Sequence, residues 1–348
     1  MTLTELSFYS RRMLPLFIIF FIVFLIFVYA IKLMFIYLDL ARPHTIYTNP
    51  VFGPISRPVI KDASPSAGYA FTLDTIEGQP ITSSEAAKVY FLPQSSARFG
   101  YSQKIYPVAK LFGFDIELIK HNLTDKVATF IDDQRRLAID ITNYNFRYEY
   151  SFNKNPKLFE QATIPSKSVI ENKTIDFLKT VGRYPEELAK GKTNIVYMQY
   201  NTDQESMVPV PRPVDANAVE IDFYRPDIDS FSTVSPTYYN SQNFMVVTFQ
   251  ENEMIILRAQ IAFFEKSEEQ IGTYSLKTGD EAWEELKAGK GIVISPGKSS
   301  KDVSIKKMFT AYYDADIYQQ YLQPVYVFLG SDNFVGYVPA VVNKYLTD

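Results

Sequence analysis

The feature that most constrains this chain is an uncharged apolar run near its start. From Met13 to Ile31 no side chain is charged, and almost every residue is apolar. An α-helix rises about 1.5 Å per residue, so about twenty residues cross a hydrocarbon core of about 30 Å. The run predicts a short tail and one membrane-spanning helix in residues 1–40, with residues 13–31 in lipid. The side chains expected to contact lipid include Met13, Phe17, Phe20, Phe24, Phe27 and Ile31.

The flanking charges predict the orientation of this helix. Arg11 and Arg12 precede the run, and basic flanks stay in the cytoplasm. We therefore expect a plasma-membrane protein with a cytoplasmic N-terminus and an extracytoplasmic bulk, although Lys32 and Arg42 weaken the asymmetry. Cleavage near Ala30 is the alternative, because Val28 and Ala30 loosely fit a signal-peptidase site. Against cleavage, the run exceeds the 7–15 residues of a usual signal core.

Composition excludes several classes of protein. The chain has no cysteine, which rules out disulfides, thiol nucleophiles and cysteine-based metal sites. A net charge of −4 without a dense Lys/Arg patch disfavours nucleic-acid binding. We expect no cofactor.

Proline and aromatic content suggest how the remaining chain is organised. Residues 41–67 hold five prolines and no periodicity, which predicts an extended stalk; an ordered strap over the first domain is the alternative. Three modules are expected to follow: a β-rich α+β module in 68–160 and helix-plus-sheet modules in 161–268 and 269–348. A single irregular β-rich domain is the alternative.

Strand and helix signals support an α+β fold of antiparallel sheets, each covered by a helix. Period-two or apolar runs joined by turn residues predict strands at 127–132, 137–141, 145–150, 194–200, 218–224, 244–250, 254–264, 291–295, 303–313, 325–329 and 334–341. Helices are expected at 102–112, 168–181 and 281–288, each followed by a glycine that suits a C-cap. Capping-box spacing occurs at Thr82, Ser168 and Thr278, each three residues before a glutamate. The last two modules resemble a weak internal repeat.

The final seventy residues carry a recognisable set of short segments. They are the helix Glu281–Leu286, the turn Gly289–Gly291, the pair Tyr312–Tyr313, the run Tyr321–Phe328 and the run Tyr337–Val341. This pattern resembles the YycH/YycI family of bacterial membrane-anchored regulators and, more loosely, the related PepSY-like modules. The resemblance implies one transmembrane helix, an extracytoplasmic domain of helix-plus-antiparallel-sheet units, and regulation of an envelope-sensing histidine kinase.

No segment predicts a catalytic or metal site. The run 291–299 has five residues between its glycines where a Walker loop has four. His44 and His121 are the only histidines, too few for a histidine-rich metal site. The acidic clusters at 132–133, 227–229 and 314–316 fall in expected turns, where aspartate caps backbone N–H groups. We therefore expect a protein that is not an enzyme.

The remaining hypothesis is binding of another envelope protein, in a regulatory or scaffolding role. Edge strands invite strand addition by a partner peptide, and 254–264 is the favoured strand. The candidate contact residues are Met254, Ile256 and Arg258 on that strand, and Tyr312, Tyr313 and Tyr326 along a groove. One alternative is a glycan-binding or hydrolytic module that uses paired carboxylates; another is a self-associating structural protein, that is, a homo-oligomer.

Overall fold

The structure, a computed structural model, describes residues 3–41, 47–61, 63–96, 100–298 and 301–347, without the side chains of residues 3–12 and 39–41. The chain divides into two compact units, Met1–Tyr47 and Thr48–Asp348. The side chains of Arg11 and Arg12, and all of Arg42 and His44, lie outside the described residues.

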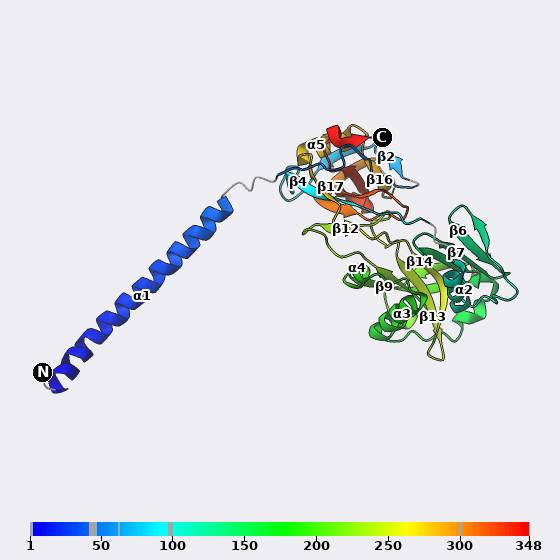
Figure 1. The fold of residues 1–348 in the computed structure, drawn as a ribbon, viewed down its shortest axis with the longest axis horizontal. Helices are drawn as coiled ribbons and strands as arrows, with labels where there is room; N and C mark the ends of the chain where they lie inside the picture. The colour runs from blue at the N-terminus through cyan, green and yellow to red at the C-terminus, as the bar shows by residue number, and fades with distance from the viewer. Residues whose placement is uncertain (1–2, 42–46, 62, 97–99, 299–300, 348) are drawn as a thin grey trace. The chain divides into compact units, whose positions relative to one another are not determined.

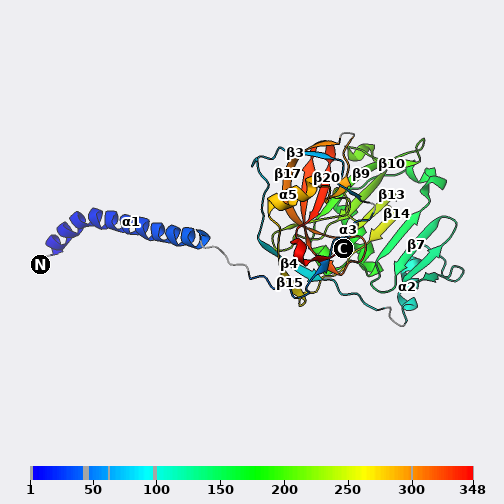
Figure 2. The same cartoon turned by 90° about the horizontal axis from the view of Figure 1, so that it is seen from above.

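The first unit is one continuous helix, α1 (Leu3–Ala41), with Pro15 in its interior and a gentle bend (Figure 2). Its segment Met13–Leu38 spans 26 residues and contains an 18-residue window with a mean hydropathy of 3.1, none of which is buried. Within the described residues this is the one helix apolar and long enough to cross a membrane, which fits a membrane anchor or a signal sequence. The apolar segment is longer than the predicted 13–31 because Leu33–Leu38 continues it. Of the expected lipid-contacting residues, Met13 and the four phenylalanines are exposed and Ile31 is partly exposed.

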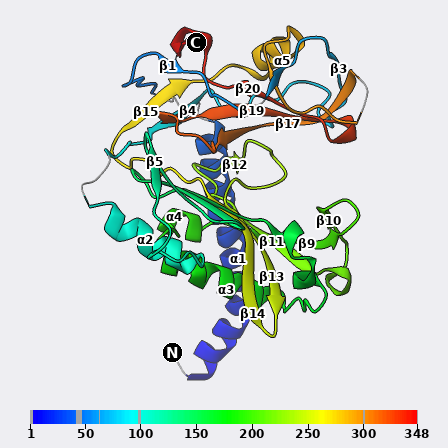
Figure 3. The same ribbon diagram turned by 90° about the vertical axis from the view of Figure 1, so that its right-hand side faces the viewer.

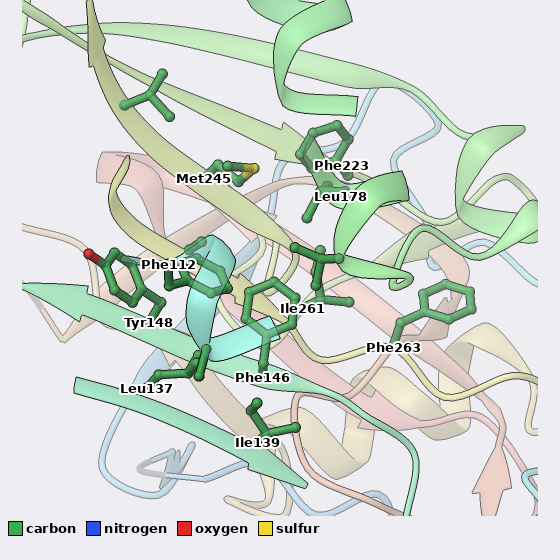
Figure 4. Packing of buried hydrophobic residues seen from close by; sticks show 14 of the residues in the cluster. Phe112, Leu137, Ile139, Phe146, Tyr148, Leu178, Phe223, Met245, Ile261 and Phe263 are labelled. Atoms are coloured by element: carbon green, nitrogen blue, oxygen red, sulfur yellow. The ribbon is translucent and has the colours of Figure 1, made fainter. Parts of the chain in front are cut away.

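A nine-stranded antiparallel sheet forms the first half of the second unit. Its strand order is β10-β9-β11-β13-β14-β8-β7-β6-β5. The strands are β5 (Asn122–Thr124), β6 (Val127–Ile131), β7 (Arg135–Asp140), β8 (Phe146–Tyr150), β9 (Thr193–Asn201), β10 (Ser206–Pro209), β11 (Ala218–Phe223), β13 (Phe244–Gln250) and β14 (Glu253–Ile261). Helices α2 (Ser102–Leu111), α3 (Lys167–Val181) and α4 (Glu186–Ala189) pack on one face, around a core rich in phenylalanine (Figures 3 and 4).

The second half contains smaller sheets built from two distant chain segments. A seven-stranded sheet holds β12 (Ser232–Val234), β17 (Asp302–Tyr313), β19 (Pro324–Gly330), β20 (Val335–Pro339), β16 (Ile292–Ser295) and β2 (Ser64–Pro65), with β3 (Ala70–Leu73) paired to β17. A three-stranded sheet joins β15 (Ile271–Ser275), β4 (Ala86–Phe91) and β18 (Tyr321–Leu322). Strand β1 (Ile55–Ser56) pairs with β21 (Leu346–Thr347). Helix α5 (Gly279–Lys287) buries Ala282, Trp283 and Leu286 against this half.

We call residues 100–264 the inserted lobe and residues 48–96 plus 265–347 the split lobe. The first lies between β4 and β15, which pair with each other, so the inserted lobe interrupts the chain of the split lobe. Among the strands of the described residues, only β12 departs from this division, because it leaves the inserted lobe to pair with β17 (Figure 1).

The observed sheets confirm the α+β class but do not follow the expected module boundaries. The boundary at residue 160 falls inside the nine-stranded sheet, where β14 pairs with β8. Strands β3 and β4, expected in module 68–160, pair with β17 and β15 of the C-terminal part. The physical reason is that an unpaired strand edge must find a partner, and the nearest one in space comes from another module.

Residues 47–61 and 63–67 do not form the expected stalk. Asn49 bridges to Thr273, Ile55 is 1% exposed, and β2 pairs with β16. The alternative, an ordered strap, describes them better, and the strap packs on the split lobe. Apolar Ile55 and the small buried Ser66 supply the contacts that a solvated stalk lacks.

Helix ends test the capping predictions individually. The capping box of Thr278 and Glu281 at α5 is confirmed, and α3 ends at Gly182 with φ of 78°. The box at Ser168 is wrong: Ser166 is the N-cap of α3 and its side chain makes no capping bond. Thr82 starts no helix, but its hydroxyl accepts the N–H of Gly279 at 2.8 Å, at the start of α5.

The weak internal repeat does not extend to topology. After α3, strands β9, β11, β13 and β14 lie side by side in chain order. After α5, the first strand β16 lies instead beside β20, at the far side of β17 and β19. The two modules therefore share the order of a helix followed by strands along the chain. They differ in where the first of those strands lies within its sheet.

Candidate partner-binding groove

Strand β14 is not an edge strand over its whole length. It pairs with β13 from Glu253 to Gln260, but with β8 only from Arg258 to Ile261. On the side facing away from β13, Met254–Leu257 makes no backbone hydrogen bond within the described chain. This half-strand therefore offers free backbone donors and acceptors beside an otherwise paired sheet.

A β-bulge directs the side chains of this half-strand. Val246 pairs with Arg258 and Val247 with Ile256, which leaves Leu257 as the extra residue. Met254 and Ile256 pack on the helix-covered core and Leu257 is buried on the opposite face with Phe152, as alternation requires; the extra residue places Arg258 on the same face as Leu257. Bulges commonly re-aim side chains in this way.

A cavity of about 480 Å³ adjoins the free half-strand. We call it the β14 groove; it is lined by Leu111, Phe112, Gly113, Arg135, Tyr148, Tyr150, Phe177, Met254, Ile255 and Ile256. Phe112 stacks on Tyr148 with ring centroids 4.4 Å apart, and its edge meets Phe177 at 5.2 Å. Figure 4 shows Phe112, next to α2, beside Tyr148 of the sheet. The groove is therefore aromatic where it meets the core.

One cation lies at the rim of the β14 groove. Arg135 is partly exposed, and its Nη1 donates to the carbonyl oxygen of Gly113 at 2.6 Å. Asp132 lies 3.5 Å from the same nitrogen. Burial raises the pKa of Tyr148 to about 12, so its hydroxyl stays neutral beside this cation. The groove thus combines a backbone edge, apolar rings and one positive charge.

Three residues predicted for a groove are instead core residues. Tyr312, Tyr313 and Tyr326 are at most 2% exposed. The hydroxyls of Tyr312 and Tyr326 donate to the carbonyl oxygens of Lys88 at 3.0 Å and Lys277 at 2.8 Å. The prediction failed because sequence alternation marks strand faces, and here both faces of β17 and β19 are covered.

The third predicted residue on β14, Arg258, lies away from the groove. Its guanidinium is 5.3 Å from the ring centroid of Phe152, on the face opposite to Met254. Of the six predicted contact residues, the structure therefore brings Met254 and Ile256 together at one cavity.

Sequence reasoning did not identify the other groove residues. Phe112 ends α2 and Phe177 lies in α3, more than sixty positions apart. Their meeting depends on how two helices cross one sheet, which no local pattern encodes. Only the alternation of Phe146, Tyr148 and Tyr150 on β8 was readable as an aromatic strand face.

One aspartate of each acidic cluster has a structural partner. Asp132 accepts the backbone N–H groups of Gln134 and Arg135, as an aspartate in a turn does. Asp229 pairs with Lys88, and buried Asp314 pairs with Arg225 at 2.9 Å.

The histidine and the Walker-like run also have structural roles. His121 lies between the hydroxyls of Tyr101 and Tyr106, at 3.2 and 3.1 Å. Ile292–Ser295, in the Walker-like run, is strand β16. In the described part of the chain, no group of three or more His, Asp or Glu residues is placed to hold a metal ion.

Comparison with known proteins gives little further information. No protein-family model and no curated protein matches the chain. Among solved structures, it is similar to an uncharacterized protein from Eubacterium rectale, with 12% identity and a TM-score of 0.37, over 79% of this chain and 90% of that one. A similarity at this level supports no argument about fold or function.

Proposed function

We propose that this chain is a membrane-anchored, non-enzymatic protein that binds another envelope protein through the β14 groove. The observation that carries the proposal is the free half-strand Met254–Leu257 beside an aromatic cavity. A backbone edge recognises another extended backbone, since strand addition satisfies donors and acceptors on both chains. The occupant is therefore an extended segment of a partner protein.

The groove also limits the chemistry of that segment. Phe112, Phe177 and Ile256 favour apolar side chains at alternate positions, because successive side chains of a strand point to opposite faces. Arg135 at the rim favours an acidic group nearby. A regulatory role of the YycH/YycI kind accords with this proposal and rests on the resemblance at residues 281–341 alone.

Placement of the groove outside the cytoplasm is part of the proposal. It rests on α1 as the anchor and on Arg11 and Arg12 as its cytoplasmic flank. The chain has no cysteine, so a single cysteine at Val214, which is 83% exposed, reports topology without background. We expect a membrane-impermeant maleimide to label Val214→Cys in intact cells. Labelling only after lysis would contradict this orientation.

Site-directed cross-linking tests the groove itself. Single cysteines replace Leu111 at the groove or Val214 far from it, both exposed apolar positions, and carry a benzophenone maleimide. Irradiation of native membranes should give one dominant adduct from position 111 and none from 214. Mass spectrometry should place the adduct on an extended segment of another protein. Equal adducts at both positions would refute the groove, and an adduct with a second copy of this chain would favour self-association.

A further inference from the structure

The free half-strand of the β14 groove is blocked at one of its two ends. Strand β8 occupies the neighbouring position from Arg258 onward, where Arg258 pairs with Glu149. At its other end, the half-strand begins at the exposed turn that joins β13 to β14. We call these the closed end and the open end of the groove. A strand that lies along Met254–Leu257 must therefore stop, or leave the sheet, at the closed end.

The length of the free edge limits the occupant to a short segment. Four residues of a strand rise about 3.3 Å each, or about 13 Å in total. The cavity beside them, of about 480 Å³, is likewise small. An internal segment of a partner would need a sharp bend at the closed end before it could continue, whereas the end of a chain needs none.

One arginine near the closed end lies on the helix-covered face. Arg135 pairs with Tyr150, the residue that follows Glu149 on β8. Its guanidinium interacts with the hydroxyl of Tyr148, another groove residue, and its side chain is 32% exposed. The ion pair with Asp132 is long, at 3.5 Å, and the same carboxylate also accepts two backbone N–H groups. The charge of Arg135 is therefore only partly balanced.

A second arginine marks the closed end on the opposite face. Arg258 is exposed, lies over the ring of Phe152 at 5.3 Å, and forms no ion pair within the described part of the chain. Glu149, which faces it across the strand pair, is bound instead to Arg147 at 2.7 Å. The closed end therefore carries positive charge on both faces of the sheet.

The open end has a different charge. Glu251 and Glu253 are exposed at the turn, and the Nζ atom of Lys173 donates to the carbonyl oxygen of Asn252 at 2.9 Å. Two carboxylates against one ammonium leave this end negative. A negatively charged group on the occupant is thus favoured at the closed end and disfavoured at the open end.

We propose that the β14 groove binds the C-terminal end of a partner protein. This inference rests on the proposed function and adds which part of the partner is bound. The last four residues lie along Met254–Leu257, parallel to β14, and the α-carboxylate lies at the closed end, where Arg135 and Arg258 balance its charge. The chain's own C-terminal strand β21 already pairs with β1, so the terminus comes from another protein.

Selection and binding of short peptides test this proposal. Random heptapeptides displayed with a free C-terminus are selected against the full chain in lipid nanodiscs, after counter-selection on empty nanodiscs. The selected peptide is synthesised with a free carboxylate, with a C-terminal amide, and with two further glycines, each form labelled with fluorescein at its N-terminus. Fluorescence anisotropy should show that the amide and the extended form bind about tenfold more weakly, the loss of one charge-assisted hydrogen bond.

Arginine variants assign this preference to the closed end. Arg135→Gln and Arg258→Gln should each lower the ratio of carboxylate affinity to amide affinity, and the double variant should bring the ratio close to one. A loss of stability would weaken both peptides alike, so the ratio separates recognition from folding. The control Arg212→Gln, at an exposed arginine paired with Asp215, should leave the ratio unchanged.

Several results would overturn this proposal. Equal affinity for the carboxylate, amide and extended peptides would do so, as would an unchanged ratio in the double variant or a selection that enriches no peptide. The cross-link at position 111 separates this inference from the proposed function. An adduct on an internal segment of a partner would support the groove and overturn terminal recognition, whereas an adduct within the last residues of a partner would support both.

Discussion

At the scale of single residues, the clearest anomaly is a carboxylate within a sheet. Asp222, the penultimate residue of β11, has no exposed surface. Oδ1 accepts the N–H of Ser241 at 3.0 Å. Burial raises the pKa of Asp222 to about 6 from its ordinary 3.8. Burial thus makes ionisation of this carboxyl group less favourable in the folded chain than in the unfolded chain.

This shift predicts a stability that falls as pH rises. The folded state holds the proton more tightly than the unfolded state, so the stabilisation is complete below about pH 4 and lost by about pH 6. The size of the loss is about 2–3 kcal/mol. Asp222→Asn keeps the acceptor for Ser241 and removes the charge. In urea unfolding of the full chain, the variant should match the parent near pH 4 and exceed its stability near pH 7. An unchanged difference across that range would contradict the shift.

At the scale of elements, helix ends and hairpins were the most predictable features. Thr278 and Glu281 encode the start of α5 within four residues, and Gly182 encodes the end of α3. The hairpin of β19 and β20 was also expected from its turn, because period-two alternation and turn residues are local signals. Pairings between distant strands, such as β14 with β8, were not predictable, since either strand edge would accept other partners.

Two N-caps give a matched test of the capping rule. Thr278→Ala removes a hydroxyl that accepts the N–H of Glu281, and should lower the free energy of unfolding by about 1 kcal/mol. Ser166→Ala at the start of α3 removes a hydroxyl that makes no capping bond. This substitution should change the free energy of unfolding by much less. If both variants lost the same free energy of unfolding in denaturant, the capping box at Thr278 would contribute nothing to stability.

The strap of residues 47–61 and 63–67 yields a second prediction at this scale. Ile55→Ala should cost about 2–5 kcal/mol, because Ile55 is 1% exposed in the split-lobe core. Val51→Ala, at a residue 60% exposed, should cost little. A solvated stalk would make both substitutions neutral in thermal and urea unfolding. Proline content alone could not distinguish these cases, because proline suits a packed strap and an extended stalk equally.

At the scale of the whole molecule, a buried charge cluster joins the two lobes. Arg225, which follows β11, contacts Asp314, at the end of β17, and Glu187 of α4, each at 2.9 Å. Its guanidinium also lies 4.0 Å from the centre of the Phe263 ring. Side chains of Arg225 and Asp314 are 1% and 7% exposed. The sequence could not predict this ion pair, because Asp314 lies in an acidic cluster that is typical of an exposed turn.

Breaking this pair should destabilise the junction strongly. Asp314→Asn leaves the Arg225 charge buried with one partner fewer, and should cost about 3–5 kcal/mol in urea unfolding. Asp227→Asn, at an exposed position two residues after Arg225, is the control and should cost little. The double variant Arg225→Met with Asp314→Leu should recover part of the loss, since it removes both charges. A double variant less stable than Asp314→Asn would show that the pair itself stabilises the junction.

The pairing of β1 with β21 has a consequence for biogenesis. These strands are about 290 positions apart, so the ribosome finishes the inserted lobe long before β21 emerges. Domains tend to mature in order of synthesis, and the nascent β1–β4 segment must wait with its strand edges open. We infer that this waiting interval, and not the finished molecule, is when the chain most needs chaperones.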